Sequence, residues 1–246
     1  MSDENSEKKT YELNRASIAF FTNNFDGINF IILDPEELLQ VNWVIGHYYE
    51  KEMIDFIRDN YKGGSFVDAG SCIGNHSIAF SKVADHVYSF EPVQATFLQQ
   101  VAIIFVNKIR NITTYNLALG NKYGLKPIFK DNLSAGGGRI GKKGNMTVSV
   151  VKLDDFKVKD VKLIKVDVEG YELEMLKGSK KTILKHKPDL FIECATDSIF
   201  KDIWKFVNEL DVGYRVFPKC FNATPTFLFT TRSEKNFRKR VVEKVD

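Results

Sequence analysis

The sequence predicts an α/β fold of the doubly wound type, with a mostly parallel central sheet. Two short apolar runs at residues 65–68 and 86–90 flank a glycine turn and a helical stretch, which is the pattern of strand, helix and strand. Similar buried runs that end in acidic residues follow at 161–170 and 189–194. Strands that alternate with helices favour a parallel sheet covered by helices on both faces.

Length and composition favour one elaborated domain. The chain has 246 residues, 43% of them hydrophobic, and no linker divides it. Its formal charge of +3 disfavours nucleic acid as a partner but leaves it open as an alternative. Three cysteines without a C-x-x-C pair argue against a zinc site and a disulfide framework. The polar start and the lack of a long apolar run predict a cytoplasmic protein without a membrane span.

The first sixty residues are expected to form an extension ahead of the main domain. Residues 1–10 are predicted to be a disordered tail, and residues 11–60 a hairpin followed by two lid helices. Asp34 is the expected cap of the first helix, with Pro35 in its first turn. Tyr49 and Glu50 lie where the second helix begins, so they are candidate substrate contacts, although aromatic residues there often serve packing alone.

The turn after the first strand is the strongest ligand-binding signal. Gly70 and Gly74 let the backbone approach a ligand at the end of a parallel strand, and Glu91 ends the second strand, where it can accept hydrogen bonds from a ribose. The spacing lacks the G-x-G-x-x-G of a pyrophosphate site, and Asp68 suits a cationic ligand better than a phosphate. S-adenosylmethionine has that character. A tight turn that binds nothing is the alternative.

Residues 61–231 are expected to be the catalytic domain. A helix at 93–107 leads to a third strand at 112–117, whose tip at Asn116 is either an adenine contact or an ordinary turn. A short strand at 126–130 precedes a flexible, glycine-rich loop at 131–145, where Arg139 can meet an anionic substrate. The later elements are a strand at 147–152, helices at 171–177, 180–187 and 198–210, strands at 214–217 and 226–231, and a disordered basic tail at 232–246.

Together these blocks resemble the FkbM family of S-adenosylmethionine-dependent methyltransferases. The resemblance rests on VDAGSCIG at 67–74, FEP at 90–92, LDD at 153–155 and especially IKVDVEG at 164–170 with Glu172. It implies a Rossmann-like class I fold with seven strands in the order 3-2-1-4-5-7-6, the last strand antiparallel, and methyl transfer to oxygen. The sequence departs from the family at Ser71 and Cys72, where alanine and asparagine are more usual.

The resemblance also implies a set of cofactor-binding residues. Glu91 would bind the ribose, residues 116–118 the adenine edge, and the glycine turn the methionine part. The full set is Asp68, Gly70, Ser71, Gly74, Asn75, His76, Glu91, Pro92, Asn116, Leu117, Ala118 and Asp167.

Charged residues at the end of a buried strand are the candidate catalytic groups. Transfer to a hydroxyl benefits from a nearby base, for which Asp167 is the first candidate and Glu169 the second, with Lys165 orienting one of them. His76 is a third candidate, or else a structural hydrogen-bonding residue. Asp167 and Glu169 share one face of a strand, which permits a divalent cation, but no complete ligand set accompanies them.

Three functions remain open from the sequence. The favoured one is an O-methyltransferase that acts on a hydroxyl of a sugar, a glycan or a natural-product small molecule. The second is an RNA or protein methyltransferase, which the basic loop and tail would suit. The third is a non-catalytic nucleotide-binding protein that keeps the fold. No motif specifies an oligomeric state.

Overall fold

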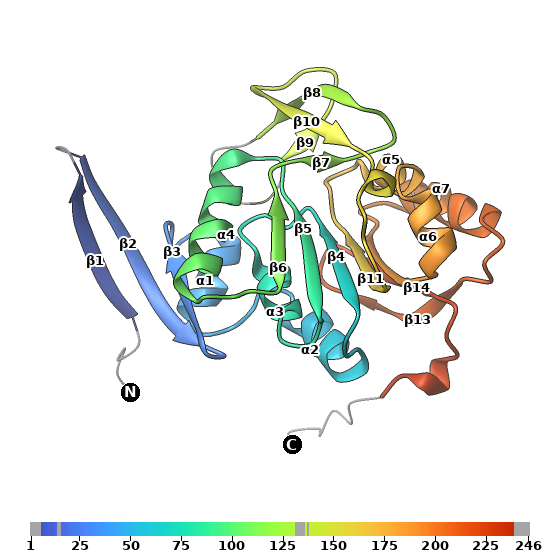
Figure 1. Ribbon diagram of the computed structural model, residues 1–246, viewed down its shortest axis with the longest axis horizontal. Coiled ribbons are helices and arrows are strands. Elements are labelled where there is room, and N and C mark those ends of the chain that lie inside the picture. The colour runs from blue at the N-terminus through green and yellow to red at the C-terminus, as the bar shows by residue number, and fades with distance from the viewer. Residues whose placement is uncertain (1–5, 14–15, 131–135, 137, 239–246) are drawn as a thin grey trace.

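The computed structural model describes residues 6–13, 16–130, 136 and 138–238. Its main sheet consists of β4 (Ser65–Ala69), β5 (His86–Phe90), β6 (Ile112–Tyr115), β11 (Val161–Val166), β12 (Asp189–Glu193), β13 (Arg215–Phe221) and β14 (Thr226–Thr230). The strand order is β13-β14-β12-β11-β4-β5-β6 (Figure 1). Only β14 runs against its neighbours; the other pairs are parallel. The predicted order and the antiparallel strand are therefore confirmed.

Helices cover both faces of the main sheet, as expected for a doubly wound fold. On one face, α2 (Lys51–Asn60) and α3 (Asn75–Phe80) pack through Met53, Ile57 and Phe80 against Phe66 of the central strand. The other face packs against α5 (Glu172–Lys177), α6 (Lys180–His186) and α7 (Asp197–Glu209). Every residue of β4 is buried, because a central parallel strand is covered on both sides.

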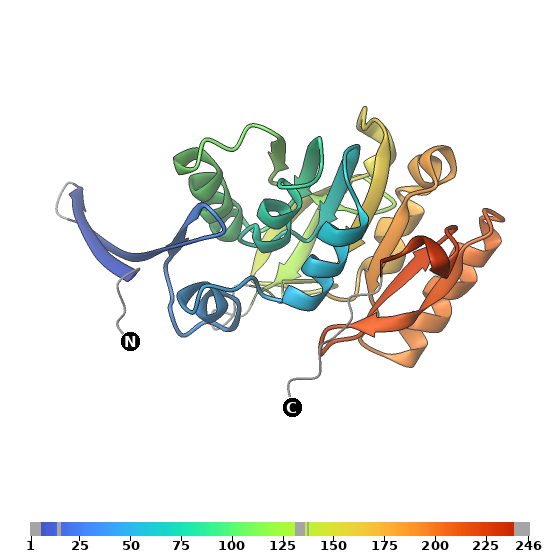
Figure 2. The ribbon, with the colours of Figure 1, turned by 90° about the horizontal axis from the view of Figure 1, so that it is seen from below.

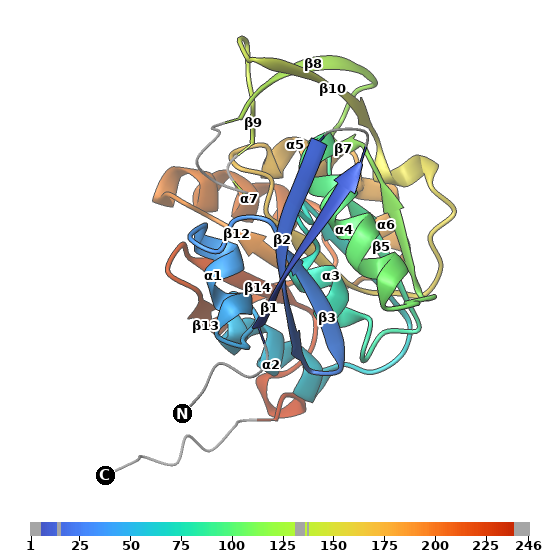
Figure 3. The same ribbon diagram turned by 90° about the vertical axis from the view of Figure 1, so that its left-hand side faces the viewer.

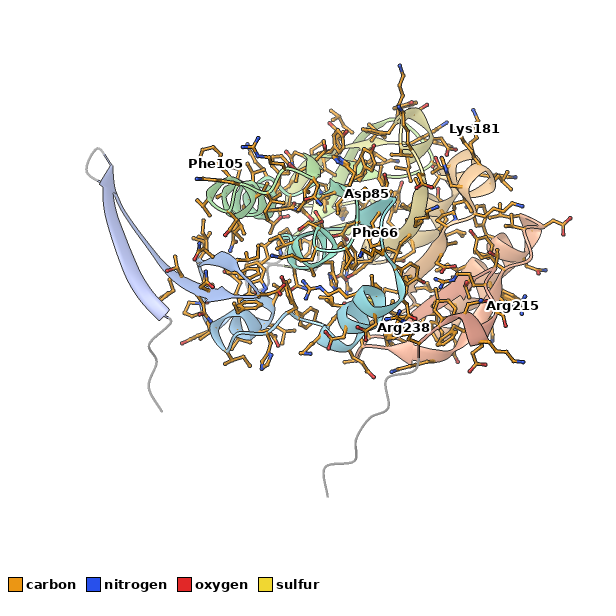
Figure 4. The ribbon with its side chains drawn as sticks, turned by 60° about the horizontal axis from the view of Figure 1, so that its bottom comes forward. Phe66, Asp85, Phe105, Lys181, Arg215 and Arg238 are labelled. Atoms are coloured by element: carbon orange, nitrogen blue, oxygen red, sulfur yellow. The ribbon has the colours of Figure 1, made fainter. Side chains whose placement is uncertain are left out.

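The helix α4 (Gln94–Val106) connects β5 to β6 and contains no charged residue. Its Ile103 is buried, whereas Phe105, near its end, is 80% exposed. Figure 4 shows the contrast between Phe105 at the surface and Phe66 among packed side chains.

The N-terminal extension contains the predicted hairpin and one strand more. A three-stranded antiparallel sheet has the order β1 (Ser6–Leu13), β2 (Ala16–Phe25) and β3 (Ile28–Ile32). The predicted disordered tail is wrong for residues 6–10, which belong to β1, while residues 1–5 lie outside the described part. The strands β1 and β2 project from the body of the molecule (Figure 2), and they lie in front of it when it is viewed from that side (Figure 3).

Both helices of the extension begin later than predicted. The first, α1 (Leu38–Val44), is capped by Glu37, whose carboxylate accepts hydrogen bonds from the N–H groups of Leu39 and Gln40. Asp34 instead accepts one from the N–H of Glu36 in the preceding turn. The helix α2 begins at Lys51 because Glu50 has a left-handed backbone conformation, with φ of 56°.

A separate small sheet lies between β6 and β11, and it includes strands at the two places, 126–130 and 147–152, where the sequence predicts them. It has the order β7-β10-β8-β9, formed by Ala118–Leu119, Met146–Val151, Gly124–Phe129 and Arg139–Ile140 respectively. The predicted loop is therefore wrong at β9, while residues 131–135 and 137 lie outside the described part. Ile128, Val148 and Val150 bury a small core against Val93 and Ala118. This sheet lies above β6 in Figure 1.

The start of the predicted basic tail is ordered. Arg232 pairs with the buried Asp189 at 3.3 Å, and the ring of Phe237 packs beside Tyr61 with 5% of its surface exposed. Residues 239–246 lie outside the described part. All three cysteines are free. Within the described residues, no helix has the length and apolar character that crossing a bilayer requires.

Candidate active site

A cavity of about 410 Å³ opens at the carboxyl ends of β4, β5, β11 and β12. This is the edge at which open α/β sheets bind ligands, and the volume is within the usual range for small-molecule sites. The wall is completed by the small sheet and by the segment that the sequence predicts to be a lid (the lid segment, residues 34–60). The predicted site residues in this wall are Tyr49, Glu50, Gly70, Ser71, Asn75, His76, Glu91, Pro92, Leu117, Ala118, Arg139, Lys165, Asp167 and Glu169. Asp68, Gly74 and Asn116 are not among the lining residues.

The turn after β4 depends on its two predicted glycines. Gly70 has φ of 79°, and a Cβ atom there would lie 1.7 Å from the backbone oxygen of Asp167. Gly74 has φ of 92°, and a Cβ atom would lie 2.6 Å from Cγ of Gln100. Only glycine combines a left-handed backbone with these close approaches. Gly74 thus shapes the turn from behind the wall.

Glu91 lies in the wall beside this turn with 6% of its surface exposed. Its Oε2 accepts a hydrogen bond from the N–H of Cys72 at 2.8 Å, and its Oε1 accepts bonds from the N–H of Val93 and the hydroxyl of Thr96. Burial raises the pKa of Glu91, although these donors oppose the shift. Each carboxylate oxygen has two lone pairs, so Oε2 retains capacity for another donor.

Asp68 supports the wall from behind. Its side chain is completely buried, and Oδ2 accepts a hydrogen bond of 2.6 Å from the hydroxyl of Ser77 in α3. Its Oδ1 lies 3.5 Å from Nζ of Lys165. Asp68 therefore fixes Lys165 and the start of α3 and does not itself reach the cavity.

Lys165 is the central cation of the site and is 2% exposed. Its Nζ lies 3.2 Å from Oδ2 of Asp167 and 3.5 Å from the backbone oxygen of Gly70. Burial alone would lower the pKa of Lys165, but Asp167, Asp68 and Glu50 together raise it. Lys165 is consequently a permanent positive charge that orients Asp167, as the sequence suggests.

Asp167, Glu169 and Glu193 bring three carboxyl groups to one end of the cavity. Glu193 ends β12 and forms a hydrogen bond with Asp167; burial, Asp167 and Glu169 raise the pKa of Glu193 to about 9. Glu169 has φ of 56°, and its carboxylate lies 3.6 Å from Nε of the exposed Arg139.

Glu172 fixes the loop that carries Asp167 and Glu169. Its buried carboxylate accepts hydrogen bonds from the N–H groups of Gly170 and Val168 at 2.8 and 3.3 Å. Burial raises the pKa of Glu172 despite these bonds. Glu172 is thus the structural member of the strand-exit motif, beside Asp167 and Glu169, which face the cavity.

The lid segment is held to the site by Asn75 and His76. The side-chain oxygen of Asn75 accepts hydrogen bonds from the indole N–H of Trp43 and the N–H of Tyr49, and its nitrogen donates to the carbonyl of Tyr49. Nε2 of His76 lies 3.0 Å from Oε2 of Glu50, and both atoms are buried without a hydrogen bond to any described residue. The polar groups of Asn75 are therefore committed to the lid.

Tyr49 faces the acidic end of the cavity. Burial, followed by the charges of Glu50, Asp167 and Glu193, raises its pKa to about 12. The hydroxyl is therefore protonated at neutral pH and is available as a hydrogen-bond donor.

The opposite end of the cavity is mostly apolar. Leu117, Ala118 and Pro92 line it together with Phe90 and Ile128. Asn116 donates hydrogen bonds to the carbonyl oxygens of Glu91 and Pro92 and so joins the ends of two strands. The side chain of Asn116 therefore has a structural function in this turn, which is one of the two roles that the sequence leaves open for this residue.

The sheet order and the cavity at its strand exits define a Rossmann-like class I methyltransferase. The family model described as "Methyltransferase FkbM domain" matches residues 68–216. The chain therefore belongs to the FkbM methyltransferase family and is an S-adenosylmethionine-dependent methyltransferase.

The chain is also similar to one curated protein and, in fold, to solved structures. The chain is 27% identical over 199 residues to a hexuronic acid methyltransferase, AglP, of Haloferax volcanii, across 76% of this chain and 78% of that protein. The crystal structure of methyltransferase FkbM from Methylobacillus flagellatus has a TM-score of 0.56 and 20% identity, covering 68% of this chain and 43% of the other. The crystal structure of Trm5b from Pyrococcus abyssi has a TM-score of 0.50 and 11% identity, and the match covers 90% of this chain and 61% of that chain. The chain thus spans less than half the length of the FkbM structure.

The cavity suits S-adenosylmethionine chemically. The buried Oε2 of Glu50 has no hydrogen-bond donor among the described residues, and carboxyl groups of Asp167 and Glu169 face the same space, which favours a cationic sulfonium and ammonium. The spare acceptor capacity of Glu91 suits ribose hydroxyls. Within the described ranges, no group of three or more histidine, cysteine or acidic side chains could hold a metal ion.

Several lining residues are absent from the predicted set. Glu193 had the same signal as Glu91, an acid at the end of a buried strand. The contacts made by Glu37, Ile128, Tyr171 and Thr224 depend on how distant segments pack. No local pattern in the sequence marks those four positions.

Proposed function

We propose that this methyltransferase transfers a methyl group to a hydroxyl of a sugar, a glycan or a natural-product small molecule. The observation that carries the proposal is the Asp167 carboxylate in the cavity wall, held at 3.2 Å from the buried cation of Lys165. A fixed carboxylate is a suitable acceptor for a hydroxyl proton. The hexuronic acid methyltransferase supports a sugar as the acceptor.

The cofactor would lie along the glycine turn. Gly70, Ser71 and His76 would surround its methionine part, Glu91 would accept hydrogen bonds from the ribose, and Leu117 and Ala118 would contact the adenine. When bound, S-adenosylmethionine supplies a methyl group that is already electrophilic. The protein then has to align the acceptor oxygen and exclude water.

The acceptor would lie between the acidic end and the lid. Asp167 would take the hydroxyl proton while Lys165 keeps its carboxylate in place. Tyr49, Glu50 and Arg139, which line the same cavity, would contact the remainder of the acceptor. The alternative bases, Glu169 and His76, are less suited, because Glu169 pairs with Arg139 and His76 faces Glu50.

The test combines an acceptor panel with one variant. The purified protein and methyl-labelled cofactor are offered methyl glycosides of a neutral hexose, an amino sugar and a hexuronic acid, and separately total RNA. We expect label in a glycoside as an alkali-stable methyl ether, identified by mass spectrometry. Label in RNA alone, with a steep loss of binding as salt rises, would replace this function with the nucleic acid alternative.

The variant Asp167→Asn tests the base. We expect it to retain cofactor affinity in calorimetry but lose turnover by about 10²–10⁴-fold, the usual contribution of a general base. Asp202→Asn makes the same chemical change at an exposed position of α7 that does not line the cavity, and we expect wild-type turnover from it. Undiminished turnover in Asp167→Asn would exclude Asp167 as the base.

A further inference from the structure

Glu193 is a carboxyl group of the site to which neither the family match nor the motif assigns a role. The register between β11 and β12 pairs Val166 with Ile192, so the following residues, Asp167 and Glu193, leave the sheet side by side. Both line the cavity, and their side chains are hydrogen-bonded to each other. Two carboxyl groups can form such a bond only when one of them carries a proton.

The surroundings decide which group carries the proton. The positive charge of Lys165 lies 3.2 Å from Oδ2 of Asp167, whereas no cation lies this close to Glu193 among the ion pairs of the described residues. Burial, followed by the charges of Asp167 and Glu169, raises the pKa of Glu193 to about 9 in spite of the opposing charge of Lys165. Glu193 is therefore the protonated member and donates to Asp167.

Two other titratable groups face Glu193. Burial raises the pKa of Cys194 to about 12, and burial also raises that of Tyr49 to about 12. Neither group changes its charge between roughly pH 6 and pH 10. Glu193 is thus the group expected to titrate near pH 9.

We propose that Glu193 is a positioning residue that holds Asp167 against the acceptor hydroxyl through a proton shared between the two carboxyl groups. This inference rests on the proposed O-methylation. As the bond from sulfur to the methyl carbon breaks and the bond from oxygen to that carbon forms, the hydroxyl proton passes to Asp167. The pair then holds two protons instead of one, the sulfonium becomes a neutral thioether, and the pair later releases one proton to water.

The arrangement predicts a loss of activity in alkali. When Glu193 loses its proton, two adjacent carboxylates repel each other, and Asp167 loses the donor that fixes its orientation. Misplacement of a reacting group by about 1 Å can reduce the rate about 10²-fold. Turnover should therefore fall with a midpoint near pH 9.

The experiment compares kcat from pH 6 to pH 10 in wild-type protein, Glu193→Gln and Glu193→Ala, at saturating cofactor and with an accepted hydroxyl substrate. The glutamine amide still donates to Asp167 but cannot ionise, so Glu193→Gln should keep more of the rate than Glu193→Ala and lose the alkaline fall. Glu193→Ala should lose about 10–10²-fold throughout. Glu209→Gln, at the exposed end of α7, is the matched control and should keep the wild-type profile.

Two results would overturn the inference. One is an alkaline fall in Glu193→Gln identical to that of wild type, and the other is full kcat in Glu193→Ala. A measurement without an acceptor separates this inference from the proposed function: the ¹³C carboxyl resonance of Glu193 should titrate near pH 9. If Glu193 titrates near pH 9 but no hydroxyl substrate is methylated, the proposed O-methylation is refuted and the proton shared with Asp167 is supported. If Glu193 titrates near pH 4.5, the shared proton is refuted.

Discussion

Replacing Lys165 with methionine should destabilise the protein strongly. The Nζ atom lies 3.2 Å from Asp167 and 3.5 Å from the completely buried Asp68. At an effective dielectric constant of about 20, each contact corresponds to roughly 5 kcal/mol of attraction before the cost of desolvation. Methionine fills a similar volume but leaves the Asp68 charge buried and unpaired. We therefore expect Lys165→Met to lower the free energy of unfolding by about 3–5 kcal/mol.

Urea unfolding of two further variants tests this reasoning. Lys162→Met changes an exposed lysine of the same strand, whose partner Asp160 is also exposed, and should cost less than about 1 kcal/mol. Asp68→Asn in the Lys165→Met background removes the unpaired charge and should restore about 1–3 kcal/mol. If Lys165→Met costs no more than Lys162→Met, the buried ion network does not stabilise the fold as described.

Three other outcomes are expected. Gly70→Ala should lower the free energy of unfolding by more than about 2 kcal/mol beyond the loss in Gly213→Ala. Both glycines have a similar positive φ, but of the two only Gly70 faces a backbone oxygen. Equal shifts of the melting temperature in the two variants would contradict this. Glu91→Ala should reduce cofactor affinity in calorimetry about 10²–10⁴-fold by removing two charge-assisted hydrogen bonds, and an unchanged affinity would remove its ribose role. Between about pH 5 and pH 9 the folded state keeps a proton on Glu193 that the unfolded chain has lost. The free energy of unfolding should therefore fall by about 1–3 kcal/mol across this range, and less steeply in Glu193→Gln. Parallel curves of unfolding free energy against pH for the two proteins would refute the pKa shift of Glu193.

The main sheet could be predicted from sequence because its signals are local. The apolar runs of β4, β5 and β11 and the glycines of the turn carry their information within a few residues. The same local signals marked Glu91 and Asp167 as groups at strand exits. Both line the cavity, as this topology requires.

The direction of individual side chains could not be predicted in the same way. Asp68 has the sequence context of a ligand contact but turns toward Lys165 and Ser77, and Asn75 bonds to the lid. These side-chain directions depend on partners that are distant in the sequence. Trp43 lies 32 positions from Asn75, and Lys165 lies 97 positions from Asp68. The strands β8 and β10 of the small sheet were predicted, but β7 was not, because it pairs with β10 across a long separation in the chain.

The small sheet between β6 and β11 is an insertion that the main sheet does not need for its own strand pairing. Arg139 and Ile140 reach the cavity from this insertion, whereas the glycine turn and Glu91 belong to the main sheet. Changes in β9 would therefore reshape the wall that Arg139 and Ile140 form, whereas changes in β7 would also reach the side proposed for adenine through Ala118. Such a division would let the acceptor side of the cavity vary at β9 while the glycine turn and Glu91 keep their places.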